Sequence, residues 1–110
     1  MAERDLGEIL AWTETQFGVA ARLRYGKLIV AALRDIVADP DRIGSKPLPG
    51  VKGSVRIYHL RHSRERARPH GGLVRAPRHI LLYRVEADLI LVGRILHEAM
   101  DLDRQAATEV

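Results

Sequence analysis

Several side chains in this sequence are of the types that carry out acid–base chemistry on a phosphate. Cutting RNA without a metal ion requires a base for the 2′-hydroxyl, a cation for the charge that develops on the phosphate and an acid for the leaving oxygen. The leading candidates for these roles are Arg56, Tyr83 and His97. Tyr83 alternates with Leu81 and Val85, whereas Arg84 is on the opposite face, so we expect Tyr83 to be a packed strand aromatic and the candidate set not to converge. Further residues of the same types are Tyr58, Arg78, His79 and Arg84.

The five histidines do not form a metal-binding pattern. His59 and His62 are three residues apart in a predicted strand and therefore face opposite ways, and no pair has the i, i+4 spacing of helical ligands. The chain has no cysteine, which excludes disulfides and thiolate metal sites. We expect no metal and no other cofactor.

A basic segment, residues 61–79, reads RHSRERARPHGGLVRAPRH and joins two apolar runs. A link between paired strands needs only about two to five residues, so the greater length of the basic segment favours a functional role for it. Two interpretations stay open, a solvated connector and a surface that grips an acidic partner through bidentate guanidinium groups. The arginines concerned are Arg61, Arg64, Arg66, Arg68 and Arg75.

The first forty residues predict two helices that would position these groups. The stretch AERDLGEILAWTETQF has early acids and apolar residues at helical spacing, and a second apolar stripe runs from Tyr25 to Val37 before Pro40 stops it. Gly18 leaves only a short turn between them, so the helices must be antiparallel. Three apolar residues lie off these stripes and are either scattered on the surface or part of a groove for an amphipathic partner helix. They are Trp12, Leu23 and Val30.

The second half of the chain predicts strands. The runs SVRIYHLRH, HILLYRVE and DLILVGRILH follow a Gly- and Pro-rich loop at 42–53, and the last two must form an antiparallel hairpin because so few residues separate them. The third run is apolar on both faces, which is typical of a covered strand. The stretch MDLDRQAATE predicts a short closing helix with Asp101 as a candidate N-cap.

Length and composition bound the class of protein. The chain has 110 residues, 46% of them hydrophobic and 29% charged, which predicts one folded domain over residues 1–110. No apolar run approaches the roughly 18 residues of a membrane span, so we expect no membrane association. The net charge of +4 is unevenly spread, since residues 54–85 carry eight arginines and one acid whereas residues 86–110 carry two arginines and six acids. Such a patch suits nucleic acid, an acidic partner segment or the acidic tail itself.

Three stretches together resemble the RelE/ParE superfamily of bacterial toxins, specifically its ParE branch. They are AERDLGEILAWTETQFG, RHILLYRVE and VGRILHEAMD, and they follow the family order A-x-x-D-L-x-x-I, then Y-R, then R-[IV]-L-H-x-x-M-D. The resemblance covers nearly the whole chain. The matching positions are Ala2, Asp5, Leu6, Ile9, Gly18, Tyr83, Arg84, Arg94, Leu96, His97, Met100 and Asp101.

The resemblance implies an α+β fold with a helical hairpin packed on a small antiparallel sheet. It further implies a cytoplasmic toxin of a type II toxin–antitoxin pair that binds DNA gyrase without enzymatic chemistry of its own, reaches nucleic acid only indirectly, and is neutralised by a ParD-like antitoxin. A homodimer or a toxin–antitoxin heterotetramer is compatible with it. The alternatives are a RelE-like endoribonuclease that cuts messenger RNA on the ribosome and a toxin-like fold that has become an inert partner.

The sequence departs from the family pattern in two places. The family's first strand is missing before the A-x-x-D-L motif, so either the start lies upstream or the sheet has an open edge where an antitoxin segment or a second copy can add a strand. RelE-like nucleases usually have an arginine three residues before the tyrosine, where this chain has Ile80. We expect structural roles for the motif residues, with Arg94 paired to Asp101 or Asp103 and His97 holding backbone groups. The motif set is Asp5, Arg94, His97, Met100 and Asp101.

Overall fold

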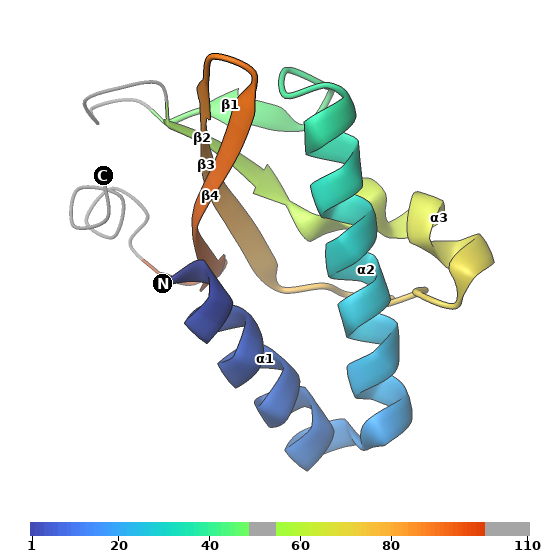
Figure 1. The fold of residues 1–110 in the computed structure, drawn as a ribbon. Coiled ribbons are helices and arrows are strands. Elements are labelled where there is room, and N and C mark those ends of the chain that lie inside the picture. Colours follow the sequence, from blue (N-terminus) through green and yellow to red (C-terminus); the bar gives the residue numbers. More distant parts are fainter. Residues whose placement is uncertain (49–54, 101–110) are drawn as a thin grey trace.

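Two helices pack on one face of a four-stranded antiparallel sheet (Figure 1). The computed structural model describes residues 1–48 and 55–100. In these ranges the strand order is β1-β2-β3-β4, and every neighbouring pair is antiparallel. The predicted α+β fold is thereby confirmed. The elements are α1 (Ala2–Phe17), α2 (Val19–Ala38), β1 (Ser45–Pro47), β2 (Val55–His59), η1 (Leu60–Ser63), α3 (Arg64–Ala67), η2 (Arg68–His70), β3 (His79–Glu86) and β4 (Leu89–His97).

The helical hairpin buries the face of α2 that the apolar stripe predicted. Gly18 breaks the helix at φ 94°, a left-handed conformation that glycine adopts without a Cβ penalty. From there α1 and α2 diverge toward the sheet (Figure 1). Two predicted apolar positions are instead exposed. They are Phe17, at the end of α1, and Val37, near the end of α2. The buried α2 residues of the core are Tyr25, Leu28, Ile29, Ala32 and Ile36.

The sheet is apolar on both faces. One face meets the helices, and its buried residues are Tyr58, Leu60, Leu81, Tyr83 and Ile95. The opposite face holds a second, smaller cluster of Leu48, Val55, Ile80, Leu82 and Leu96. This division follows the alternation of side chains along β2 and β3, as the period of two predicted.

A bulge in β4 changes which way Arg94 faces. Tyr83 pairs with Val92, but the preceding residue Leu82 pairs with Arg94, so Gly93 is the extra residue. An inserted residue shifts the alternation by one. Uninterrupted alternation would put Arg94 on the same face as Ile90 and Val92, but the bulge puts it on the face of its partner Leu82.

The basic segment is not the open hairpin loop that the sequence suggested. It forms the short helical turns η1, α3 and η2, and these pack against α2 with Leu60, Ser63 and Ala67 fully buried. Gly71 is exposed at the turn that ends η2, whereas Gly72 is buried against α2. A Cβ on Gly72 would lie 2.9 Å from the Cβ of Ala67 and 3.1 Å from a backbone nitrogen of α2, so only glycine allows this approach.

The predicted closing helix, with its N-cap Asp101 and the acid Asp103, lies outside the described residues. None of the helices in the described part of the chain has the length and apolar character that a membrane crossing requires.

Candidate functional site

A large cleft lies between the tip of the helical hairpin and the segment that leads into β3. We call it the hairpin cleft. Its volume is about 1090 Å³, which is at the upper end for a binding cleft. Its walls are mainly apolar, and arginines stand among them. The lining residues are Glu8, Ile9, Trp12, Thr13, Phe17, Ala21, Arg24, Tyr25, Leu73, Val74, Arg75, Ala76, Arg78, His79 and His97.

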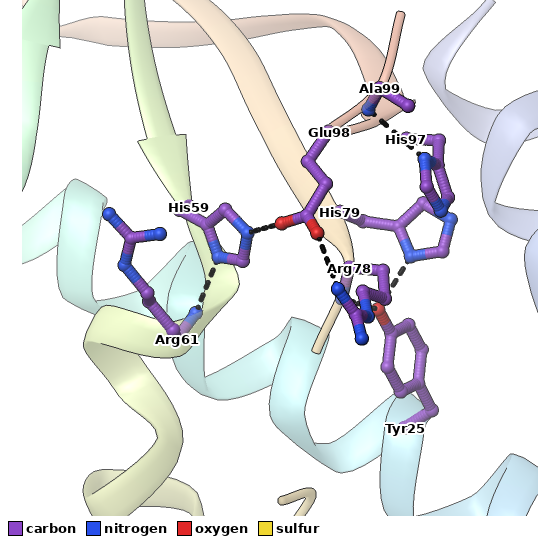
Figure 2. A network of polar contacts seen from close by, with 8 residues as sticks. All are labelled: Tyr25, His59, Arg61, Arg78, His79, His97, Glu98 and Ala99. Carbon is purple, nitrogen blue, oxygen red and sulfur yellow. Dashed lines mark hydrogen bonds and ion pairs between the residues drawn. The ribbon is translucent and has the colours of Figure 1, made fainter. Parts of the chain in front are cut away.

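Tyr25 and His79 form the polar part of the cleft lining, held by a short chain of hydrogen bonds (Figure 2). The backbone N–H of Arg78 donates to the Tyr25 hydroxyl at 3.2 Å, and that oxygen lies 2.5 Å from Nδ1 of His79. Burial raises the pKa of Tyr25 to about 12 and lowers the pKa of His79 to about 4, since both charged forms would lose solvation. Both side chains are therefore neutral at physiological pH.

His97 lies beside His79 at the end of the sheet. The two residues are cross-strand partners, and their rings make an edge contact with centroids 5.5 Å apart. Nδ1 of His97 accepts a hydrogen bond from the backbone N–H of Ala99 at 3.1 Å. This bond fixes the ring at the point where β4 turns away from the sheet.

Glu98 joins the neighbouring residues into a charged network (Figure 2). One of its carboxylate oxygens lies 2.6 Å from Nε2 of His59, and the other accepts from Arg78 at 2.9 Å. These two hydrogen bonds lower the pKa of Glu98 to about 2. Nδ1 of His59 accepts from the backbone N–H of Arg61, so both nitrogens of this imidazole are occupied.

The three proposed nuclease residues do not assemble. Arg56 and Tyr83 are cross-strand partners in β2 and β3, and the Arg56 guanidinium donates to Ser45 Oγ at 2.8 Å. Tyr83 is 1% exposed, and its hydroxyl donates to the carbonyl of Pro40 at 2.6 Å. His97 pairs with His79, four residues along β3 from Tyr83, which is roughly 13 Å in a strand. A single phosphate cannot reach all three.

The arginines of the basic segment have several different environments. Arg66 pairs with the buried carboxylate of Asp35 at 3.1 Å. Arg64 donates to the backbone carbonyl of Arg75 at 2.7 Å, and Arg75 itself lines the hairpin cleft. The other two, with exposed side chains, are Arg61 and Arg68.

The three apolar residues suggested as a partner groove lie on two separate surfaces. Trp12 lines the hairpin cleft and is 56% exposed. Leu23 and Val30 line a smaller concavity of about 490 Å³ along the outside of the helices, which we call the outer groove. The two surfaces are therefore alternative docking places and not one groove.

Asp5 and Arg94, two residues of the family motif, clamp α1 to β4. The Asp5 carboxylate accepts from Nε of Arg94 at 2.7 Å, from its terminal nitrogen at 3.1 Å and from the backbone N–H of Ile95 at 2.9 Å. Arg94 is thus in an internal ion pair, and its partner among the described residues is Asp5. Of the remaining motif residues, Met100 is 45% exposed and Asp101 is outside the described ranges.

Sequence reasoning missed two acids. Asp35 is 6% exposed, binds Arg42 and Arg66, and accepts from Ser63 Oγ at 2.6 Å. Asp35 comes three residues after Ala32 and therefore falls on the buried face of α2, which is the feature of the sequence that could have identified it. Glu98 had no periodic signal, because its role depends on two residues that only the sheet brings near.

The described residues contain no group of three or more side chains placed to hold a metal ion. The described structure is a small α+β fold, and its hairpin cleft is apolar, has arginines at its rim and lies beside a cluster of hydrogen-bonding side chains. A family model for the ParE toxin of the type II toxin–antitoxin system parDE matches residues 1–102. The chain therefore belongs to the ParE toxin family. No curated protein and no solved structure gave a match.

Proposed function

We propose that this chain is the toxin of a type II toxin–antitoxin pair, that it binds DNA gyrase in the cytoplasm and stalls the DNA-cleaved intermediate, and that a ParD-like antitoxin neutralises it. The observation that carries the proposal is the match to the ParE toxin model over residues 1–102. Membership of the family supports an antitoxin partner directly and the gyrase target by extension.

The geometry of the described side chains supports action by binding and not by catalysis. Tyr83 is fully buried and hydrogen-bonded, and the cross-strand pair of His97 with His79 lies four residues along β3 from the pair of Arg56 with Tyr83. Acid–base cleavage of a phosphodiester needs its groups within hydrogen-bond reach of one phosphate. In this mechanism the chain therefore binds gyrase and contacts nucleic acid only indirectly.

A ribosome-dependent endoribonuclease is the alternative, and one observation favours it. His59, Arg78, His79, His97 and Glu98 gather at one end of the sheet and include acid, base and cation types. In the described structure both nitrogens of His59 and both oxygens of Glu98 are already engaged, which leaves little for a substrate.

Incubation of the purified chain with gyrase and plasmid separates the two functions. We expect linear DNA after detergent and protease treatment, because a stalled enzyme keeps the broken strands covalently attached. Cleavage of messenger RNA on translating ribosomes together with normal supercoiling would instead establish the nuclease.

A matched pair of variants tests the basic segment in the same assay. R61A/R68A removes two exposed arginines from the basic segment, and R4A/R22A removes the same charge from the helical hairpin. We expect the first pair to weaken trapping by about ten-fold, the loss of one or two charge-assisted hydrogen bonds, and the second to change it little. Equal losses would mean nonspecific attraction to DNA, and no loss in either would make the segment a structural connector.

A further inference from the structure

The hydrogen bonds of His79 favour one tautomer. The Tyr25 oxygen accepts the backbone N–H of Arg78 and lies 2.5 Å from Nδ1 of His79, so the Tyr25 hydroxyl is placed to donate to Nδ1. In that arrangement Nδ1 carries no hydrogen. The low pKa of His79, about 4, keeps the ring neutral, so its one hydrogen is on Nε2.

His97 has the same tautomer for an independent reason. Its Nδ1 accepts the backbone N–H of Ala99, which places the hydrogen of the neutral ring on Nε2. The two rings meet edge on, at 85° and 5.5 Å between centroids, and Figure 2 shows them side by side. The end of the hairpin cleft thus presents two neighbouring N–H donors, and neither has an acceptor among the hydrogen bonds of the described residues.

Two imidazole N–H groups select an oxygen acceptor and reject a metal ion. A metal ligand must offer a lone pair, and the nitrogens with lone pairs are already hydrogen-bonded. Arg78, which is ion-paired with Glu98, lies next to the two histidines, and the cleft lining adds Arg24 and Arg75 against the acid Glu8. The site therefore favours an anionic oxygen.

The walls of the hairpin cleft indicate what carries that oxygen. Trp12, Phe17, Leu73 and Val74 make them apolar over a volume of about 1090 Å³. The charge of Arg78 is already balanced by Glu98, so the local field suits one carboxylate in an apolar body better than the row of phosphates on a nucleic acid.

We propose that the hairpin cleft takes an amphipathic segment of the antitoxin, and that one carboxylate of this segment accepts hydrogen bonds from Nε2 of both His79 and His97 beside Arg78. The proposal rests on the proposed function, which supplies the partner. It assigns the antitoxin to the hairpin cleft and leaves the outer groove, with Leu23 and Val30, outside this contact.

The test measures binding of the full chain to the product of the neighbouring gene by calorimetry. We expect H97A and R78A each to raise Kd by about ten-fold or more, as loss of a charge-assisted hydrogen bond does. The control H70A removes an exposed histidine outside the cleft and should leave Kd unchanged. His79 is partly buried, so H79Q serves as a second variant only where circular dichroism shows it folded.

Amide substitutions in the antitoxin identify the carboxylate. Changing its acids one at a time to asparagine or glutamine should reveal one position that weakens binding to the wild-type chain but not further to H97A. Nitrogen-15 spectra of the free chain should show both rings in the Nε2–H form.

The binding experiment distinguishes failure of the proposed function from failure of the hairpin-cleft proposal. If the neighbouring gene product does not bind, the proposed function loses its partner while the tautomers can still be correct. If it binds H97A and R78A as tightly as wild type, or loses affinity on L23E and not on W12E, the hairpin-cleft proposal is wrong and the antitoxin role stands. Displacement of the antitoxin by short duplex DNA, or self-association of the chain through the cleft, also overturns it.

Discussion

Removal of the Asp5 carboxylate should be the most damaging single change on α1. Asp5 is 7% exposed and accepts three hydrogen bonds, two from Arg94 and one from the backbone N–H of Ile95. In D5A the guanidinium loses a buried counter-charge and the Ile95 N–H loses its acceptor, a change that typically costs about 3–5 kcal/mol in total. Since the free energy of unfolding of domains of this size is about 5–15 kcal/mol, a large share of the stability would be lost.

Urea unfolding provides the measurement. A loss of about 4 kcal/mol lowers the midpoint by roughly 2 M at a typical slope for this size. Trp12 is the sole tryptophan and lies on α1, so its fluorescence follows that helix while circular dichroism at 222 nm follows both helices. An earlier fluorescence transition would show that α1 detaches first, and with it one wall of the hairpin cleft.

E8A is the matched control on the same helix. The Glu8 carboxylate pairs with Arg4 at 3.3 Å, with both side chains mostly exposed, so its loss should cost less than about 0.5 kcal/mol. The reasoning is refuted if D5A costs less than about 1 kcal/mol or unfolds like E8A. An intermediate cost for D5N is expected, because its amide keeps one acceptor oxygen.

Three further predictions concern stability. G44A should lower the free energy of unfolding by about 1–3 kcal/mol, because Gly44 has φ +99° and an added Cβ would lie 2.6 Å from the His62 ring. The control G7A, in α1, has nothing within 4 Å of the added Cβ and should raise the free energy of unfolding by about 0.5–1 kcal/mol. Similar urea midpoints for the two variants would contradict this. Y83F should lose about 1–2 kcal/mol through its missing hydroxyl bonds without reducing toxicity in a growth assay, and a loss of toxicity in a folded variant would favour the nuclease. The free energy of unfolding should fall as pH drops from 6.5 toward 4, since burial lowers the pKa of His79 to about 4 and the unfolded chain takes up the proton first; urea midpoints of H79Q across this range should show a smaller slope.

Local pattern was sufficient for α1, α2, β2, β3 and β4 and for the buried stripe, but it missed β1, which lies inside the predicted loop at 42–53. Tyr25, Leu28 and Ile36 fall at helical spacing, and Tyr58 and Tyr83 fall at strand spacing, and all five are buried. It failed at β4 because the bulge that shifts Arg94 depends on how β3 and β4 pair. It also failed in the basic segment, where burial of Ser63 and Ala67 against α2 outweighs the high charge of the neighbouring residues.

The candidate site was only partly accessible from sequence. Trp12 and Arg75 were identified as surface residues for a partner, but nothing local places them on the same cleft. The donors at its end depend on Tyr25 of α2 meeting His79 of β3, a contact between residues 54 apart.

The sequence by itself determined the long helices and strands, their apolar faces and the family, because these depend on the spacing of residue types along a few turns or one strand. Tertiary structure alone decided the partners of Asp5, Asp35 and Glu98 and the hydrogen bonds of His79 and His97. Such choices depend on distances of about 3 Å between groups that are far apart in the chain, and residue spacing carries no information at that scale.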